Sequence, residues 1–590
     1  MNPKAHEFLK KLKQDLNPPQ YEAVTYTGGP LLVLAGAGSG KTRVITYRVA
    51  YLISVLGLAP WNVLAVTFTN KAAREMQERI QGLLGGMPKG LWIGTFHSIC
   101  ARILRMDGQA MGIDPHFIIY DTADQNAAMK RARAQCPVGE DNRVSPAQFL
   151  YQISRAKNRF EGPKEYAEKA KSAFDQAVAL VYAEYQKVLR ENHALDFDDL
   201  LLECVRLIRS VPSVGDVYRQ RFHHILVDEY QDTNVPQSLL IQELARGHGH
   251  VCVVGDDDQS IYRWRGATVE NILFFGQDYA GLRTVRLEQN YRSTRMILGA
   301  AGGLIRHNQS RHDKTLWTKG GTGEKAGIVN LPDEHSEAYW ICGQAQRLHE
   351  GEERIPYGDI AVFFRTNAQS RLFEEECVRR GIPYTIVGGL AFYQRKEIKD
   401  VLAFARLLLN PSDRVSFERV INIPRRKLGE KTVQKLVIAA ERMNIPILEA
   451  ARRAGEVGAE AGLSPASRSG FMEFAHPFES WKSLSGPVPA YALVEKIVTE
   501  SGYMDLLEKS PDPQDEARLD NVKELINSVA LFEEKLEMPA PLDTLSILQH
   551  YLENIALLSD VDQMSESGDA LVLMTVHSAK GLEFSTVFVS

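Results

Sequence analysis

Short apolar runs recur through the first half of the chain, and each one ends in small or polar residues. They are LLVLA from Leu31, VLAVTF at 63–68, LWIGTF from Leu91, ILV before Asp228 and VCVVG at 251–255. Uninterrupted runs of this kind are typical of parallel strands that are buried on both faces. Between them, stretches such as 43–53 and 69–80 repeat apolar residues at helical spacing. The pattern predicts an α/β fold with a parallel sheet.

Two long stretches depart from this pattern, because their strand signals give way to polar, helix-rich sequence. A second α/β section follows the first of them, with strands expected at 326–331 and 359–371, and a small-residue loop is expected at 451–470. The predicted boundaries are 1–110 and 194–285 for one α/β domain, 111–193 for its helical insert, 286–382 and 553–590 for a second α/β domain, and 383–552 for the insert of that domain.

The run LLVLAGAGSGKTR at 31–43 has the form of a phosphate-binding loop between a strand and a helix, G-x-x-x-x-G-K-[ST], with Ala35 at the first glycine position. Alanine fits there if its φ is negative. The alternative, an ordinary glycine-rich turn, is disfavoured by the frame of glycines, lysine and threonine behind a strand. The sequence therefore predicts ATP or GTP binding by Gly36, Ala37, Gly38, Ser39, Gly40, Lys41 and Thr42, with the last two on phosphate and Mg²⁺.

A pair of acids, Asp228 and Glu229, follows the strand-like run that precedes 228. At the end of a strand, one carboxylate can bind Mg²⁺ while the second activates a water molecule. Taken alone, two adjacent acids after a strand form a polar turn about as often as they form a catalytic pair. Because they lie downstream of a phosphate loop, we favour hydrolysis of the nucleotide.

Aromatic and basic residues alternate in IYRWRGA, just after the run at 251–255 and Gln259. Rings that stack on unpaired bases, interleaved with arginines that pair with phosphates, would suit single-stranded nucleic acid. Phe68 and Thr69 lie at the carboxyl end of one predicted strand, and Thr95 and His97 lie at the carboxyl end of another, so we expect all four at the sheet edge where ligands bind.

Composition adds limits rather than a function. The chain has 590 residues, enough for several domains, with 44% hydrophobic and 24% charged residues. It has no apolar run long enough to cross a bilayer and no signal peptide at its start, so we expect a cytoplasmic protein. The net charge of −5 means that a DNA surface would have to be local. The six cysteines are scattered, without the spacing of a metal site.

Eight motifs in order carry a resemblance to a known family. They are AGAGSGKT, VTFTNKAA, GTFHS, LVDEYQDT, GDDDQSIYRWRGA, LEQNYRS, FRTNAQSR and MTVHSAKGLEF. With these motifs the chain resembles the UvrD/Rep/PcrA family of superfamily 1 DNA helicases. The resemblance implies two RecA-like motor domains, 1A and 2A, each interrupted by a helical insert, 1B or 2B. It also implies ATP with Mg²⁺, 3′ to 5′ movement on single-stranded DNA, binding to single-strand/duplex junctions, repair or replication proteins as partners, and a monomer or weak dimer.

The same resemblance implies a role for each matching residue. Those around the nucleotide are Gln20, Arg43 and Tyr291 at adenine, Lys41 and Thr42 at phosphate and Mg²⁺, Asp228 at Mg²⁺, Glu229 as general base, Gln259 at the γ-phosphate, Arg292 as an arginine finger and Glu583 near the ribose. The candidate DNA-binding residues are Phe68, Thr69, Thr95, His97, Tyr262, Trp264, Arg265, Asn367 and His577.

One departure from the family concerns the end of the chain. Family members continue into a further strand and a second arginine that reaches the γ-phosphate, and this chain stops at Ser590. Since an arginine finger raises turnover by about 10³ to 10⁵, the chain as given is expected to bind ATP and DNA but to hydrolyse ATP poorly. Two alternatives stay open: the motor of an AddA- or RecB-like helicase-nuclease, and an ATP-gated module that only binds single-stranded DNA.

Overall fold

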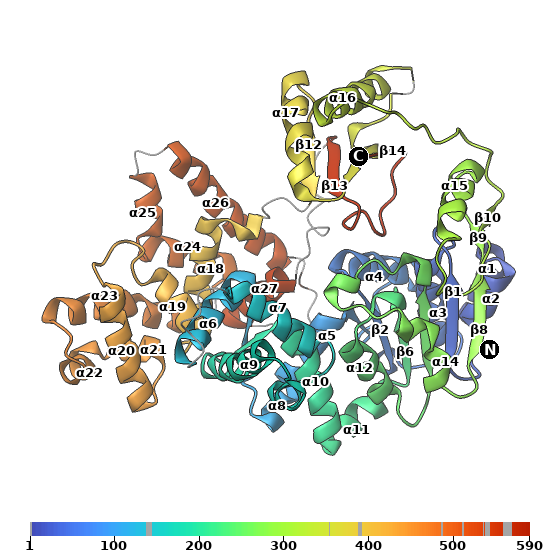
Figure 1. The fold of residues 1–590 in the computed structure, drawn as a ribbon. Helices are drawn as coiled ribbons and strands as arrows, with labels where there is room; N and C mark the ends of the chain where they lie inside the picture. The colour runs from blue at the N-terminus through green and yellow to red at the C-terminus, as the bar shows by residue number, and fades with distance from the viewer. Residues whose placement is uncertain are drawn as a thin grey trace. The chain divides into compact units, whose positions relative to one another are not determined.

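A computed structural model of the chain describes residues 3–136, 144–352, 354–387, 392–484, 488–509, 513–534, 536, 543–557 and 569–590. The chain divides into two compact units (Figure 1). The first comprises Met1–Ile99, Val205–Gly389 and Leu558–Ser590, and the second comprises Cys100–Cys204 and Leu390–Leu557. The predicted domain boundaries stay predictions.

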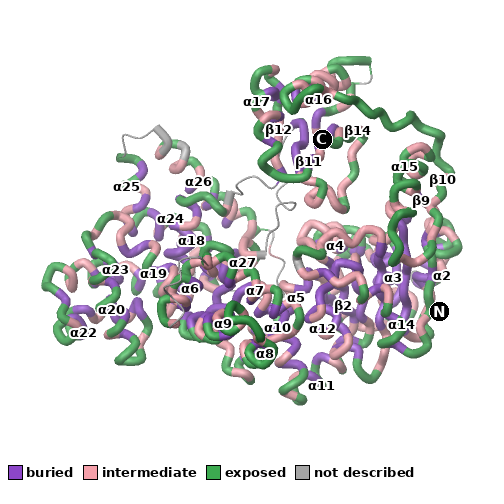
Figure 2. Tube along the Cα trace, viewed as in Figure 1, coloured by how far each residue is buried: buried purple, intermediate pink, exposed green. Residues whose placement is uncertain are grey.

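The first unit contains a sheet of six parallel strands in the order β3-β2-β6-β7-β1-β8. The strands are β1 Leu31–Ala35, β2 Val63–Thr67, β3 Trp92–Thr95, β6 His224–Val227, β7 Val251–Gly255 and β8 Arg283–Leu287. Every residue of β1, β2 and β7 is buried (Figure 2), as expected for central parallel strands with helices on both faces. The predicted α/β fold with a parallel sheet is confirmed.

The helices that accompany this sheet lie before, between and after its strands in the sequence. They are α1 Pro3–Asp15, α2 Pro18–Thr25, α3 Lys41–Ser54, α4 Asn70–Leu84, α5 Phe96–Asp107, α10 Phe197–Ser210, α11 Pro212–Arg221, α12 Val235–Ala245, α13 Glu270–Leu273, α14 Phe275–Asp278 and α15 Arg295–Ile305. Helix α4 shows the local logic: Thr69 caps its start by accepting a hydrogen bond from the Ala72 N–H at 3.1 Å, and Met76 and Ile80 are buried one turn apart.

A second, smaller parallel sheet in the same unit has the order β12-β13-β11-β14. Its strands are β11 Ile360–Phe364, β12 Tyr384–Val387, β13 Leu571–Thr575 and β14 Thr586–Val589, with helices α16 Glu334–Glu350 and α17 Ser370–Arg380. Strand β13 therefore pairs with strands that precede it by about two hundred residues. A two-stranded pair, β9 Gln289–Asn290 and β10 Trp317–Thr318, lies between the sheets in sequence.

The strand expected at 326–331 is wrong. These residues have no regular secondary structure, and Ile328 is 98% exposed. The apolar run AGIVNL has strand-forming residues, but a strand exists only where a neighbouring strand accepts its backbone hydrogen bonds. The stretch is instead part of an exposed connection from β10 to α16.

The second unit is mainly helical, with one short parallel pair, β4 Ile118–Tyr120 and β5 Ala194–Asp196. Its helices include α6 Thr122–Gln135, α7 Pro146–Lys157, α8 Pro163–Lys169, α9 Ala173–Glu191, α18 Lys396–Leu409, α19 Arg414–Val420, α20 Glu430–Met443, α21 Ile447–Arg452, α22 Ala454–Glu460, α23 Pro465–Ser483, α24 Ala490–Glu500, α25 Tyr503–Glu508, α26 Pro513–Glu534 and α27 Thr544–Leu557. Phe404, Phe474, Phe478 and Trp481 pack together in its larger core.

The loop expected at 451–470 is also wrong, because α22 and the start of α23 occupy it. Alanine is the best helix former and its small side chain packs closely, so a stretch rich in alanine can be a buried helix. Ala454 and Val457 are buried here. No described helix is long and apolar enough to span a membrane, and all six cysteines are free thiols.

Four histidines stack where β6 and β7 begin, the opposite end of these strands from Asp228. The rings of His224 and His250 are 4.8 Å apart and nearly parallel, and those of His223 and His248 are 6.4 Å apart. Burial lowers the pKa of His224 to about 3, and the neighbouring His250 acts in the same direction. The folded protein therefore resists protonation of this imidazole.

This stack makes the first unit sensitive to acid. Between pH 6.5, the ordinary pKa of histidine, and pH 3, the unfolded state binds the proton that the folded state refuses, so stability falls as the pH falls. The free energy of unfolding decreases between about pH 7 and pH 5, and we expect this decrease to be smaller by about 1 kcal/mol in His224→Asn. This figure allows for partial exposure of the ring. Thermal unfolding at the two pH values measures this, with exposed His6→Asn as the control. Equal acid sensitivity in the wild type and His224→Asn would contradict the assignment.

Candidate active site

The loop between β1 and α3 has the geometry of a phosphate-binding loop. Ala35 is the last residue of β1, so its backbone is extended and an alanine meets no conflict there. Gly38 and Gly40 have φ values of 64° and 89°, which residues with a side chain rarely adopt. The Ser39 hydroxyl donates to the Gly36 carbonyl at 2.7 Å and closes the loop on itself.

Three side chains from other segments hold this loop in place. The Gln20 amide donates to the Ser39 carbonyl at 2.9 Å, and the Asn290 amide donates to the Ala37 carbonyl at 2.6 Å. Gly36 is covered by Leu316, since a Cβ atom at position 36 would lie 2.1 Å from the Leu316 Cδ2. Gln20 is only 1% exposed. Its side chain supports the loop backbone in this structure, and its predicted contact with adenine stays a prediction.

The two acids stand at the end of β6, facing the loop. Asp228 is 2% exposed and accepts hydrogen bonds from the Thr42 hydroxyl at 3.3 Å and from the Glu229 N–H at 2.9 Å. Burial raises the pKa of Asp228 to about 7, and the charge of Glu229 adds to this rise. Burial alone would raise the pKa of Glu229 too, but Lys41 and Lys580 outweigh it and bring that pKa below its ordinary value. Glu229 is therefore an ionised carboxylate at neutral pH.

Lysines from two distant segments meet at Glu229. The Lys41 Nζ lies 3.5 Å from the Glu229 Oε1 and donates to the Gln259 Oε1 at 3.1 Å. The Lys580 Nζ lies 3.7 Å from the Glu229 Oε2, donates to the Gln259 carbonyl at 2.7 Å and forms an ion pair with Asp232. The sequence-predicted Lys41, Asp228, Glu229 and Gln259 are thus brought together.

Several residues of this site were missed by the sequence analysis. Lys580 and Asp232 form one ion pair, and the Gln231 amide donates to the Glu229 Oε2 at 2.6 Å. The Gln231 Oε1 also accepts the Asp256 N–H at 2.9 Å, which joins the ends of β6 and β7. The signals were present in the motifs DEYQDT and SAKGLEF, in which Gln231, Asp232 and Lys580 were given no role.

The other predicted nucleotide residues are less tightly gathered. The Arg43 guanidinium lies 5.6 Å from the centre of the Tyr47 ring. The Tyr291 hydroxyl accepts a hydrogen bond from the Asn17 amide at 2.8 Å. The Arg292 Nε donates to the Glu583 Oε2 at 2.6 Å, and both side chains are largely exposed. Their predicted roles at adenine, ribose and γ-phosphate stay predictions.

Aromatic candidates for DNA contact cluster beside this site. The Tyr262 hydroxyl donates to the His577 carbonyl at 3.0 Å, and the Trp264 ring stands edge-on to the His577 ring at 5.9 Å. Trp264 is 61% exposed, which leaves a large aromatic surface accessible. The side chain of Arg265 lies outside the described residues.

The remaining DNA candidates lie at the ends of other strands. Phe68, after β2, packs edge-on against Phe96 at 5.7 Å. Thr95 is buried at the end of β3, where its hydroxyl accepts the Ser98 N–H at 3.2 Å. The others are Thr69, which caps α4, His97 in α5, and Asn367, which is exposed in the turn Asn367–Gln369 after β11.

Comparison with known proteins gives a consistent answer. The UvrD/REP helicase N-terminal domain matches residues 16–280, and the UvrD-like helicase C-terminal domain matches residues 285–454 and 471–590. The chain is 43% identical over 581 residues to the ATP-dependent DNA helicase PcrA of Leuconostoc citreum, covering 98% of this chain and 77% of that protein. It is 43% identical over 584 residues, with the same coverage, to PcrA of Bacillus subtilis, and 40% identical over 581 residues to PcrA of Staphylococcus aureus, 78% of which is covered. The chain belongs to the UvrD/REP helicase family.

Both family regions contribute to the site. The N-terminal match contains the phosphate loop, Asp228, Glu229 and Gln259, and the C-terminal match contains Lys580. In this UvrD/REP family member the ion pair between Lys580 and Glu229 therefore joins the two matched regions.

Gly40 offers a direct test of the phosphate loop in this family member. We expect Gly40→Ala to weaken nucleotide binding by about tenfold or more, because alanine is strained in the left-handed region and its Cβ would lie 2.9 Å from the Gln20 Nε2. Titration with a fluorescent ADP analogue measures the affinity. Gly85→Ala is the matched control, since Gly85 has φ 73° but no heavy atom within 4 Å of an added Cβ. Unchanged affinity in Gly40→Ala would show that this loop does not bind the nucleotide.

Proposed function

We propose that this chain is an ATP-dependent DNA helicase that moves 3′ to 5′ along single-stranded DNA. The observation that carries the proposal is a pair of loops, one after β7 and one after β13. The first holds Gln259 and Tyr262, and the second holds Lys580 and His577. Lys580 bonds to the Gln259 carbonyl, and Tyr262 bonds to the His577 carbonyl. Each loop thus carries one residue proposed for ATP and one proposed for DNA. The two ATP residues contact each other, and so do the two DNA residues.

At the nucleotide, the chain supplies charge and one base. Lys41 neutralises the β- and γ-phosphates, and Gln259, held beside it at 3.1 Å, senses the γ-phosphate. Glu229, ionised by its two lysine neighbours, accepts a proton from the attacking water. Arg292 and Glu583 separate from their mutual ion pair to reach the γ-phosphate and the ribose.

Thr42 and Asp228 fit a site for Mg²⁺. Both offer hard oxygen ligands and lie 3.3 Å apart, and the buried Asp228 has a raised pKa that a cation would lower. Within the described residues no group of three or more histidine, cysteine or acidic side chains could hold a metal ion. This accords with Mg²⁺, which takes few protein ligands together with phosphate oxygens. When bound, it neutralises charge that develops on the phosphates.

On the DNA side, Tyr262, Trp264 and His577 stack on unpaired bases, while the candidates at β2, β3 and β11 line the rest of the strand's path. The DNA strand bound in this way would be the unpaired strand of a single-strand/duplex junction. We expect a monomer or weak dimer that acts in the cytoplasm with repair or replication proteins. The loops after β7 and β13 contact each other, so a movement that brings them around ATP also moves the aromatic side chains that bind the bases. Hydrolysis of ATP reverses this movement.

Removal of Lys41 tests whether ATP drives this protein. We expect Lys41→Ala to lower DNA-stimulated ATP turnover by about 10²-fold or more, because a charge aimed at the transferring phosphoryl group is lost. ATPase and strand-displacement assays with and without oligo(dT) measure this on the complete protein, with exposed Lys89→Ala as the control. Turnover that DNA does not stimulate, or tight ATP-dependent DNA binding without turnover, would contradict a helicase.

Trp264 tests the path of the DNA strand. We expect Trp264→Ala to weaken oligo(dT) binding by about tenfold or more, since base stacking on one aromatic ring contributes about 1–3 kcal/mol. Fluorescence anisotropy measures the affinity. Trp61→Ala removes a tryptophan of similar exposure that precedes β2, and it should leave the affinity for oligo(dT) unchanged. Equal effects of the two substitutions would remove Trp264 from the path.

A further inference from the structure

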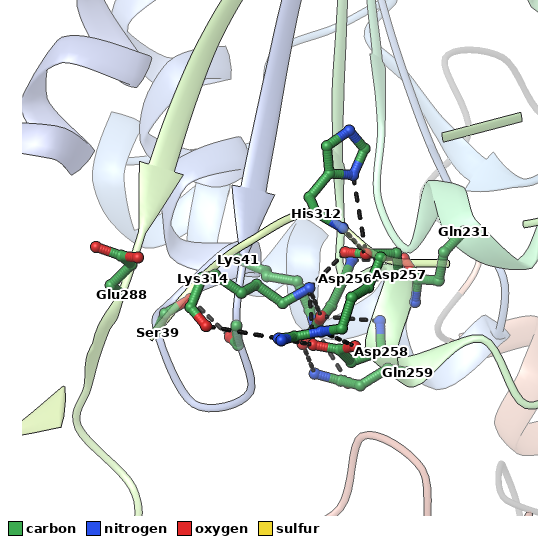
Figure 3. A network of polar contacts seen from close by, with 12 residues as sticks. Ser39, Lys41, Gln231, Asp256, Asp257, Asp258, Gln259, Glu288, His312 and Lys314 are labelled. Atoms are coloured by element: carbon green, nitrogen blue, oxygen red, sulfur yellow. Dashed lines mark hydrogen bonds and ion pairs between the residues drawn. The ribbon is translucent and has the colours of Figure 1, made fainter. Parts of the chain in front are cut away.

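A buried cluster of charges lies next to the phosphate loop, and the proposed reaction does not use it (Figure 3). It joins the acidic turn Asp256–Asp258, after β7, to the segment Arg311–Thr315, before β10. The Lys314 ammonium, with a side chain only 3% exposed, lies 2.7 Å from the Asp256 Oδ1 and 3.0 Å from the Asp258 Oδ2, and it also forms an ion pair with Asp257. One lysine thus contacts three consecutive carboxylates.

The segment around Lys314 is fixed on both sides. Arg311 binds Asp258 through two hydrogen bonds of 2.9 Å and 2.8 Å. The Thr315 N–H donates to the Glu288 Oε1 at 3.0 Å, and the Leu316 side chain covers Gly36 of the phosphate loop. Lys314 is therefore held by neighbours that do not depend on its own ion pairs.

An unbroken chain of contacts leads from Lys314 to the site of ATP hydrolysis. The Asp256 Oδ1 faces Lys314, and the Asp256 Oδ2 accepts a hydrogen bond from the Gln259 Nε2 at 2.6 Å. The Gln259 Oε1 in turn accepts from the Lys41 Nζ at 3.1 Å. Asp256 is 2% exposed, so water does not compete for either of its oxygens.

The amide of Gln259 needs such support because it could turn over. Its oxygen faces Lys41 only while its nitrogen has an acceptor on the other side, and Asp256 is that acceptor. Three adjacent carboxylates, of which Asp256 and Asp257 are buried, repel one another unless a cation balances them. Burial by itself lowers the pKa of Lys314, but Asp256 and Asp257 outweigh it and raise that pKa above its ordinary value, so the lysine stays charged.

We infer that Lys314 is a positioning residue for ATP hydrolysis, which acts by holding Asp256 against the amide of Gln259. The inference rests on the proposed role of Gln259 at the γ-phosphate. Lys314 pairs with the aspartates of the turn and acts on the site through Asp256 and Gln259. It belongs to a segment whose exposed continuation leads to the second sheet.

The test compares steady-state ATP hydrolysis, saturated with oligo(dT), in variants of the complete protein. We expect Lys314→Met to lower kcat about tenfold, as for loss of one hydrogen bond to a charged group in the transition state, while KM for ATP stays within about threefold. Arg311→Met removes a cation of the same cluster that pairs with Asp258 and supports the Lys314 backbone, and it should lower kcat less than Lys314→Met does. Lys319→Met, an exposed lysine in the same stretch, is the surface control.

Gln259→Ala separates this inference from the proposed function. If Lys314 acts through Gln259, adding Lys314→Met to Gln259→Ala causes no further loss of kcat. An unchanged kcat in Gln259→Ala would refute the role of Gln259 itself. A normal loss in Gln259→Ala, with kcat kept in Lys314→Met or with additive losses in the double variant, would overturn the inference about Lys314 alone.

A folding defect is kept apart from a loss of positioning by two further measurements. Affinity for a fluorescent ADP analogue reports whether the phosphate loop is intact in each variant. If Lys314→Met loses that affinity, the charge-balanced Lys314→Met/Asp257→Asn variant replaces it, because Asp257 does not contact Gln259. An unchanged kcat in a variant that binds ADP normally counts against the inference.

Discussion

The site depends on the balance of negative charge at one edge of the first sheet. The ends of β6 and β7 bring six acids together, and neighbouring charges about 4 Å apart repel by about 4 kcal/mol even in a partly screened environment. Cations from three separate segments offset this repulsion: Lys41 from the phosphate loop, Lys314 from the stretch before β10, and Lys580 from the stretch after β13. The acids therefore become a working site only when all three segments are in place, and the order of the strands is what brings them there.

Most of the first sheet was predictable because a buried parallel strand leaves a plain record in the sequence. The runs that became β1, β2, β6 and β7 are apolar apart from His224 at the start of β6 and Thr67 at the end of β2, and each run ends at the site. The errors came where the residue types of a segment favour one secondary structure and its tertiary contacts favour another. Residues 326–331 have strand-forming side chains but no neighbouring strand, and residues 451–470 look like a loop but bury small side chains as helices. Whether a neighbouring strand or a helical core lies beside a segment cannot be read from its local sequence.

Much of the candidate site was also predictable, since a phosphate loop and a pair of acids each carry their chemistry in a few adjacent residues. What local sequence could not supply was the pairing over long distances. Lys580 meets Asp232 across 348 positions, and Lys41 meets Gln259 across 218. Lys314 lies in an unremarkable polar stretch, RHDKT, and only the fold reveals that its ammonium is buried among aspartates. Gln20 shows the reverse case, a residue expected beside adenine whose amide is bonded to the loop backbone.

Glu229 has a backbone conformation that favours glycine or asparagine, with φ 50° and ψ 40°. Holding a glutamate there costs of order 1–3 kcal/mol, and the surrounding sheet and ion pairs must supply it. Asparagine would tolerate the same backbone better and would relieve the mutual repulsion with Asp228, but it could not accept a proton. In the proposed reaction, stability and turnover therefore make opposite demands on position 229. Asparagine would relax the backbone, but it would also remove the carboxylate that pairs with Lys41 and Lys580 and that the proposed hydrolysis needs as its base.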